Sequence, residues 1–187
     1  MIMTVAELKQ FIETDEADSV LEGKLQALEL LVRAYTNNNF HVRAFRAVAI
    51  STNGHELLCN GAVPFAAGDT LDITESDFMP DCIVTVKSVE SSADGSTITV
   101  NESLYEESGI VITKVKYPQD VKMGVANLLK WELDKRDKVG VASESISRHS
   151  VTYVDQTGEN TVMGYPVALM GFLKAYKKAR FGRGIRV

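Results

Sequence analysis

The spacing of hydrophobic residues along the first 40 positions is helical. Thr4 followed by Glu7 has the spacing of a capping box and predicts a short helix through about Ile12. A polar link follows, in which Asp18 or Ser19 could cap a longer amphipathic helix. Its apolar stripe recurs at helical spacing, at Leu21, Leu25, Leu28, Val32 and Tyr35. The sequence TNNNF (36–40) is expected to end this helix, because asparagine tolerates a left-handed C-cap.

The period changes to that of extended chain from about Arg43 to Lys116. The segments 82–89, 96–100 and 109–115 alternate and are rich in β-branched residues, and 66–73 has the pattern of a turn that enters a strand. Several short strands joined by turns of Gly, Asp and Asn predict a small antiparallel barrel or sandwich.

Helical spacing returns at 117–138, where Pro118 suits the first turn and Asp120 complements the helix dipole. Gly140 is expected to stop this helix. The next stretch, 145–163, has the pattern of a hairpin: one strand SISRHSVTYV, a turn DQTGEN and a second strand TVMGY. A last helix is predicted to begin near Tyr165 and Pro166.

Together these elements predict an α+β fold. We expect a helical bundle core of about four helices, an inserted small antiparallel β domain, and a C-terminal β-hairpin before the last helix. The predicted domains are a helical one, from residues 1–42 and 117–187, and an inserted β-barrel or sandwich-like one, residues 43–116.

Composition indicates a soluble globular protein. The chain has 187 residues, of which 45% are hydrophobic and 24% are charged. No apolar stretch approaches the ~20 residues that span a bilayer, and the N-terminus turns polar too soon for a secretory signal. Folding in a cytosol is therefore expected. Cys59 and Cys82 belong to no CxxC pair, which favours two lone thiols over one disulfide.

Charge is distributed unevenly along the chain. The net charge is −5, yet residues 174–187 carry six basic residues and no acidic one, which leaves a balance of −11 for the rest. The stretch between Ala47 and Lys116 holds eleven acidic residues against three lysines. An acidic body argues against a general nucleic-acid binder, because phosphates are repelled.

The basic end, KAYKKARFGRGIRV, has two interpretations that stay open. It is either a charged helix end with a frayed tail, or a docking segment. In the second case Phe181 and Ile185 would supply apolar anchors, while the cations would steer the segment to an acidic groove.

The stretch VASESISRHSVTY places serine, carboxylate and histidine close together in sequence. A serine nucleophile needs a base within hydrogen-bonding reach, and no GxSxG turn is present. In one continuous strand, Ser145 and His149 would share a face about 13 Å apart, which is too far for a hydrogen bond. We therefore favour a polar, partly exposed strand over a hydrolase site.

Metal sites are not favoured either. The sequence HELLC (55–59) lacks the second half of an HExxH motif and lies in a β-like region. The carboxylates of the β segment form no calcium loop and are interpreted as solvated surface acids: Asp69, Asp72, Glu75, Asp77 and Asp81. We expect no metal and no cofactor.

The order of elements resembles the bacteriophage head–tail connector family, the adaptor or head-completion proteins that lie beneath the portal. The resemblance is carried by TVAELKQFI, by the leucine-rich second helix, by YPQDVKMGVANLLKWELDKRDKVGVASESISRHSVTYVDQ and by GYPVALMGFLKAYKKARFG. It implies a non-enzymatic subunit that assembles into a twelve-fold ring matching the portal. The ring would extend the DNA channel, without sequence-specific binding, toward a downstream head-closure or tail-joining protein.

The resemblance also implies roles for particular residues. The final helix and tail would dock on the portal through Tyr176, Lys177, Lys178, Arg180, Phe181 and Arg183. The strand from Ser145 to Tyr153 would contact a neighbouring subunit or the channel through Ser145, Arg148, His149 and Tyr153. Such a protein would be found at the head–tail interface of the virion, and in the host cytoplasm during assembly, with no membrane partner. The alternative function is a nucleic-acid-binding module that uses the β domain and the basic tail.

Overall fold

The chain divides into two compact units. The computed structural model describes residues 1–79, 82–92, 94–135, 143–146, 149–152 and 160–179. One unit comprises Met1 with Asn39–Tyr117, and the other comprises Ile2–Asn38 with Pro118–Val187. We call them the barrel unit and the helical unit.

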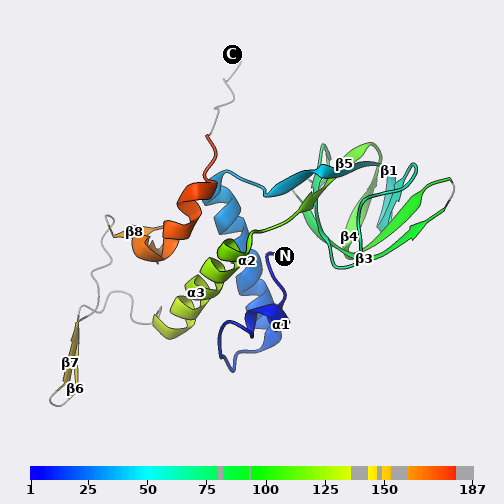
Figure 1. Cartoon of the computed structure of the whole chain (residues 1–187). Coiled ribbons are helices and arrows are strands. Elements are labelled where there is room, and N and C mark those ends of the chain that lie inside the picture. The colour runs from blue at the N-terminus through cyan, green and yellow to red at the C-terminus, as the bar shows by residue number, and fades with distance from the viewer. Residues whose placement is uncertain (80–81, 93, 136–142, 147–148, 153–159, 180–187) are drawn as a thin grey trace. The chain divides into compact units, whose positions relative to one another are not determined.

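The barrel unit is a closed antiparallel barrel of five strands (Figure 1). The strands are β1 (His41–Cys59), β2 (Thr70–Thr74), β3 (Cys82–Ser91), β4 (Ser96–Glu107) and β5 (Ile110–Val115), paired in the order β1-β4-β3-β2-β5. The first half of β1 pairs with β5 and its second half with β4. The register shifts on both sides of Gly54, whose φ of 58° favours glycine. These bulges bend β1, so that one strand closes the barrel.

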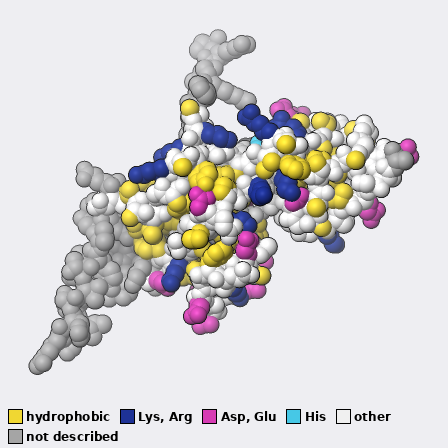
Figure 2. All heavy atoms as spheres, in the orientation of Figure 1, with side chains coloured by type: hydrophobic (Ala, Val, Ile, Leu, Met, Phe, Trp, Pro, Cys, Tyr) yellow, Lys and Arg dark blue, Asp and Glu magenta, His cyan; other side chains and the backbone are white. Residues whose placement is uncertain are grey.

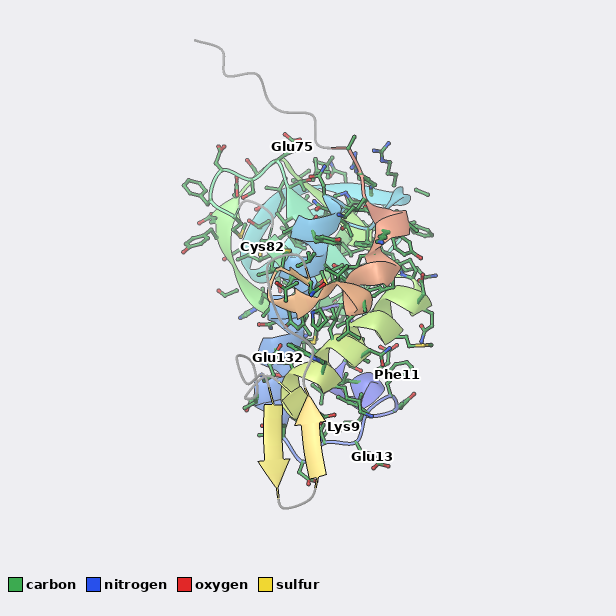
Figure 3. All side chains as sticks on the ribbon, turned by 90° about the vertical axis from the view of Figure 1, so that its left-hand side faces the viewer. Lys9, Phe11, Glu13, Glu75, Cys82 and Glu132 are labelled. Atoms are coloured by element: carbon green, nitrogen blue, oxygen red, sulfur yellow. The ribbon has the colours of Figure 1, made fainter. Side chains whose placement is uncertain are left out.

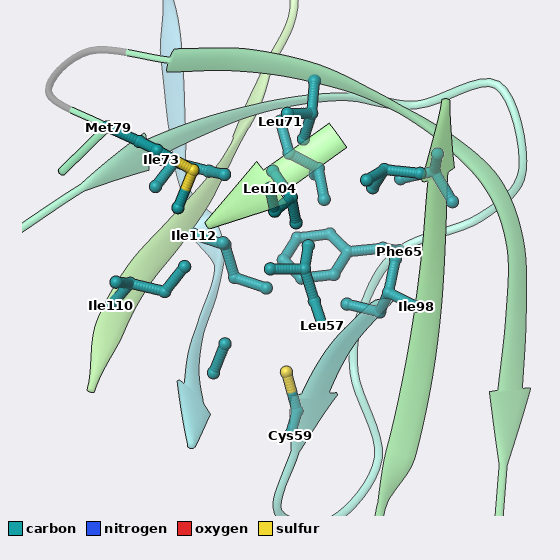
Figure 4. Close-up of a cluster of buried hydrophobic side chains, with 14 residues drawn as sticks. Leu57, Cys59, Phe65, Leu71, Ile73, Met79, Ile98, Leu104, Ile110 and Ile112 are labelled. Atoms are coloured by element: carbon teal, nitrogen blue, oxygen red, sulfur yellow. The ribbon is translucent and has the colours of Figure 1, made fainter. Parts of the chain in front are cut away.

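The interior of the barrel is filled by apolar side chains from all five strands and from the β1–β2 and β2–β3 connections (Figure 4). Alternation of inward and outward residues, as at Leu71 and Ile73 on β2, produces this core. The buried cluster consists of Ala49, Leu57, Cys59, Phe65, Leu71, Ile73, Met79, Val84, Val86, Ile98, Val100, Leu104, Ile110 and Ile112.

The chain enters and leaves the barrel unit at adjacent points. The Lys116 backbone N–H donates to the Phe40 carbonyl oxygen (3.1 Å), and the rings of Phe40 and Tyr117 lie 4.8 Å apart between centroids. Phe40 has a positive φ of 55°, which is uncommon for an aromatic residue. The contact between these tilted rings therefore holds the two ends of the barrel segment together.

The helical unit contains α1 (Val5–Leu8), α2 (Asp18–Thr36), α3 (Gln119–Lys135) and a 3₁₀ helix, η2 (Val167–Tyr176). The predicted Thr4 cap is confirmed, since its hydroxyl accepts from the Glu7 N–H (3.1 Å). The predicted Asp18 or Ser19 cap of α2 is wrong: the N-cap is Ala17, without a side-chain cap. Apolar residues of all four elements are buried, namely Val5, Leu8, Leu21, Leu25, Leu28, Val32, Val121, Val125, Ala126, Leu128, Leu129, Met170 and Leu173.

A glycine allows η2 to pack against α3. A Cβ atom built on Gly124 would lie 2.5 Å from ring atoms of Phe172, well inside van der Waals contact. The absence of a side chain at this position therefore makes room for the aromatic ring.

Two short hairpins lie between α3 and η2 in the chain. The first pairs β6 (Ser143–Ile146) with β7 (His149–Thr152), and the second pairs β8 (Thr161–Val162) with β9 (Tyr165–Pro166). The second turns at Met163 and Gly164, both with positive φ (52° and 83°), as two-residue hairpin turns require. The predicted single hairpin over 145–163 is therefore wrong, because each of its halves pairs locally.

The predicted helical bundle core is also wrong. The described residues are mostly β structure, with a closed five-stranded antiparallel barrel and about four short helices. The strand β1 runs through 19 residues, and the sequence pattern underestimated its length. The reason is that bulges in β1 interrupt the simple alternation of inward and outward residues. The last helix, predicted from one apolar side, is a 3₁₀ helix. None of the helices in the described ranges is long and apolar enough to cross a membrane.

Candidate functional site

The end of α2 holds the start of the basic C-terminal segment. The Lys178 N–H donates to the carbonyl oxygen of Thr36 (2.8 Å), a group that the helix end leaves without a helical partner. The side-chain amide of Asn37 donates to the Ala179 carbonyl (3.0 Å), and that of Asn38 donates to the Tyr176 carbonyl (3.2 Å). We call Thr36, Asn37 and Asn38 the C-terminal clamp.

Two side chains of the same segment also bind within the helical unit. The Lys177 ammonium lies 3.8 Å from the centroid of the Tyr35 ring, which is a cation–π contact. The Tyr176 hydroxyl donates to the Asp120 carboxylate, with oxygen–oxygen distances of 2.6 and 2.8 Å. This hydrogen bond raises the pKa of Tyr176 above its ordinary value, because it stabilises the neutral phenol.

The predicted docking residues therefore fall into two groups. The clamped segment contains Tyr176, Lys177 and Lys178. The side chains of Tyr176 and Lys177 contact other residues of the helical unit, Asp120 and Tyr35. Arg180, Phe181 and Arg183 lie outside the described residues. The sequence identified the clamp asparagines only as a C-cap, which Asn37 indeed forms with a φ of 49°. The run of three asparagines was a signal for a further role of these side chains, because a helix C-cap needs only one asparagine.

The predicted contact strand is two paired strands, β6 and β7. Ser145 lies on β6 and pairs with Ser150, while His149 lies on β7 and pairs with Ile146. One continuous strand from Ser145 to Tyr153 is therefore wrong, and the 13 Å separation along it does not apply. Arg148 and Tyr153 lie outside the described residues.

A buried carboxylate lies against an imidazole on the barrel unit. Asp72 on β2 is fully buried, and its Oδ2 lies 2.6 Å from His41 Nε2 and 3.4 Å from the Asn39 amide nitrogen. Its neighbour in the ladder, Thr113, accepts a hydrogen bond from Arg46 Nε (3.0 Å). The interpretation of Asp72 as a surface acid is wrong. These polar groups tie β1, β5 and β2 together, and we assign them a structural role.

A cavity of about 370 Å³ lies in the helical unit. Its polar residues are bound to one another: Lys24 Nζ lies 2.7 Å from Glu132 Oε1, and the Tyr165 hydroxyl donates to Glu132 Oε2. Glu132 is labelled in Figure 3. Apolar residues complete the lining, namely Ala27, Leu28, Leu31 and Met163. Because Lys24 and Tyr165 both bind the Glu132 carboxylate, these contacts brace the cavity wall and indicate no particular ligand.

The other sequence candidates are separated by the fold. His55 and Cys59 both lie on β1, where His55 is exposed and Cys59 is buried in the barrel core. Burial raises the pKa of both thiols, and the carboxylates of Glu102 and Asp72 raise that of Cys82 further. Cys59 and Cys82 are free cysteines, as expected. Within the described part of the chain, no group of three His, Cys, Asp or Glu residues could hold a metal ion.

Comparison with known proteins gives no family for this chain: no family model matches it, and neither does any curated protein.

Proposed function

We propose that this chain is a structural subunit of a tailed bacteriophage or prophage, a head–tail connector that forms a ring beneath the portal. Its task is assembly: it binds the portal, continues the DNA channel, and offers a surface to the next component of the tail. Head completion would follow from that binding, without catalysis by the chain.

The observation that carries the proposal is the C-terminal clamp. Three hydrogen bonds attach residues 176–179 to the end of α2, so the basic sequence that follows starts from a defined point. A segment intended for docking benefits from such anchoring, because less conformational entropy is lost on binding. The clamp also favours the docking interpretation of the basic end over a frayed one.

The clamp indicates two different roles for the predicted docking residues. Tyr176 and Lys177 would support the segment from within the helical unit. Contact with the portal would then be made by Lys178, Arg180, Phe181 and Arg183, with Phe181 as the apolar anchor and the cations as steering charges.

The test is binding to purified portal protein, measured by co-sedimentation. Removal of residues 180–187 should leave the helical content unchanged and weaken portal binding at least about tenfold. Lys87→Gln is the matched control, since it removes one exposed cation from the barrel unit. Portal binding by the shortened chain that equals that of the intact chain would disprove the docking assignment.

The second candidate is a nucleic-acid-binding module. The observation in its favour is an exposed basic and aromatic stretch on β1, Arg43, Phe45 and Arg46, of the kind that contacts single strands. The acidic composition of the barrel segment opposes it. A titration with single-stranded DNA decides between the two: an affinity that falls steeply with salt supports this candidate, and no binding at low salt excludes it.

A further inference from the structure

The barrel unit carries a basic patch where the ladder between β1 and β5 is interrupted. His41 pairs with Val115 and Arg46 pairs with Thr113, so four residues of β1 bulge opposite one residue of β5. Within this bulge Arg43 and Phe45 are exposed, and Arg46 beside it is exposed as well. We call Arg43, Phe45 and Arg46 the basic patch. Figure 2 shows basic and hydrophobic side chains together over this part of the barrel.

Contacts within the barrel hold the basic patch in place. Arg46 Nε donates to the Thr113 hydroxyl, and Lys114 Nζ lies 5.4 Å from the centroid of the Phe45 ring. Lys114 itself is paired with Asp69 (2.6 Å). Arg43 makes no ion pair with any described residue, so its charge remains available to a partner.

A second patch has the opposite charge and also exposes aromatic rings. Phe78 and Tyr105 are each 66% exposed, with their centroids 6.5 Å apart. Three exposed carboxylates lie next to these rings in sequence, and Figure 3 labels one of them, Glu75. The acidic patch consists of Glu75, Asp77, Phe78, Tyr105 and Glu106.

Hydrogen bonds to the Glu107 carboxylate hold the chain of the acidic patch at Ser76 and Asp77. The Glu107 carboxylate accepts from the Ser76 hydroxyl and from the Asp77 N–H, each at 2.6 Å. These two hydrogen bonds hold the pKa of Glu107 below its ordinary value. The Thr52 hydroxyl completes the support, since it donates to the Tyr105 carbonyl and accepts from the Glu107 N–H.

The two patches are separate surfaces of the barrel unit. Arg46 pairs with Thr113 and Thr52 pairs with Glu107, so about six residues of β1, or about 20 Å, separate Arg46 from the residue that pairs with Glu107. Two distinct surfaces of opposite charge are what a heterologous, head-to-tail contact requires. Each also supplies exposed aromatic area, the component that usually dominates interface energy.

We infer that the basic patch of one copy of this chain binds the acidic patch of the next copy. The inference deepens the proposed function and rests on it, because it names a surface through which neighbouring subunits of the ring would meet. A nucleic acid would fit the basic patch alone. It would leave the acidic patch and its two exposed rings without a partner, and it would meet the repulsion of the acidic barrel.

The experiment uses charge reversal in the full chain, with self-association followed by sedimentation velocity over a wide range of concentrations. The basic-patch variant is Arg43→Glu, which leaves the bond between Arg46 and Thr113 intact. The acidic-patch variant is Asp77→Lys with Glu106→Lys, which keeps Glu107 in place. Each variant alone should associate at least about tenfold more weakly than the natural chain. An equimolar mixture of the two should recover association, because their reversed patches complement each other.

Matched controls reverse exposed charges elsewhere on the barrel, with Lys87→Glu on β3 and Glu56→Lys on β1, and should leave association unchanged. The inference is overturned if the natural chain stays monomeric at every concentration, if the variants associate normally, or if the mixture recovers nothing. It is also overturned if Arg43→Glu loses only salt-sensitive binding to single-stranded DNA. Since portal binding by residues 180–187 is measured separately, the proposed function can survive the failure of this contact.

Discussion

The two units are built from the sequence in different ways. The barrel unit is almost one continuous segment, Asn39–Tyr117, whereas the helical unit combines Ile2–Asn38 with residues that begin at Pro118. The barrel closes its hydrogen-bond ladder on itself and surrounds its own core. The helical unit depends on packing between segments far apart in sequence, such as α3 and η2 against α2. The difference teaches that a segment inserted between two helices can form a closed unit with a core of its own.

The largest expected effect concerns the independence of the barrel core. Leu57→Ala removes a fully buried side chain and should lower the free energy of unfolding of the barrel by about 2–5 kcal/mol. Thermal unfolding would be followed by β-sheet circular dichroism and, in parallel, by the fluorescence of Trp131, the single tryptophan, which lies on α3 beside Tyr165. The midpoint temperature of the circular dichroism transition should fall, while that of the tryptophan fluorescence transition should stay unchanged.

The neighbouring Leu58→Ala is the control for this experiment. Leu58 is 37% exposed, so its loss should shift the barrel transition far less. If the midpoint temperatures of both transitions fall together in Leu57→Ala, the two units unfold as one, and the barrel unit is not independently stable.

The next effect tests packing between distant segments in the helical unit. Gly124→Ala places a Cβ atom against the Phe172 ring and should cost about 1–3 kcal/mol, despite the better helix propensity of alanine. The tryptophan transition should fall in this variant and the barrel transition should stay. Adding Phe172→Leu should restore part of the loss, because the smaller side chain relieves the clash.

Gly171→Ala serves as the comparison within the same unit. A Cβ atom there meets nothing within 4 Å, so the tryptophan transition should change little. An equal loss in both glycine variants would mean that backbone freedom, and not the Phe172 contact, determines the effect.

These contrasts also show where sequence reasoning succeeded. Alternating β-branched residues located β3, β4 and β5, because each core-facing position repeats at two residues. The stripe from Leu21 to Val32 located α2, and Asn37 ended it in the left-handed conformation that asparagine tolerates. Local pattern was sufficient wherever one face of a regular element is buried.

Sequence reasoning failed where long-range pairing overrides local pattern. The bulges around Gly54 hid the full length of β1, and Asp72 is buried through contacts with His41 and Asn39 on another strand and its flank. The stretch at Ser145 has the pattern of one alternating strand, yet its residues form two strands, β6 and β7, that pair antiparallel with each other. The C-terminal clamp needs the fold to bring Asn38 near Tyr176, 138 positions away.

A smaller effect is expected from loosening the C-terminal clamp. Asn38→Ala removes the donor to the Tyr176 carbonyl and should cost about 0.5–1.5 kcal/mol. The loss should be local, so the measurement is hydrogen exchange of the Lys178 amide, which donates to Thr36. Exchange there should become several-fold faster while the barrel amides keep their protection. Asn60→Ala, an exposed change on the barrel unit, is the control; unchanged exchange at Lys178 in Asn38→Ala would contradict the clamp.

The smallest effect is a pH dependence confined to the same segment. The hydrogen bond to Asp120 raises the pKa of Tyr176 above its ordinary value of 10.0. A raised folded-state pKa means that the stabilisation is complete below the ordinary value and is lost as pH rises through the folded one, where a phenolate would face the Asp120 carboxylate. Exchange at Lys178 should therefore gain an extra acceleration above about pH 10, beyond the intrinsic rise with pH.

Tyr176→Phe has no such titration and should show only the intrinsic rise. Because the contact is largely exposed, the tryptophan and barrel transitions should stay where they are. An acceleration that persists in Tyr176→Phe would assign the pH response to another group.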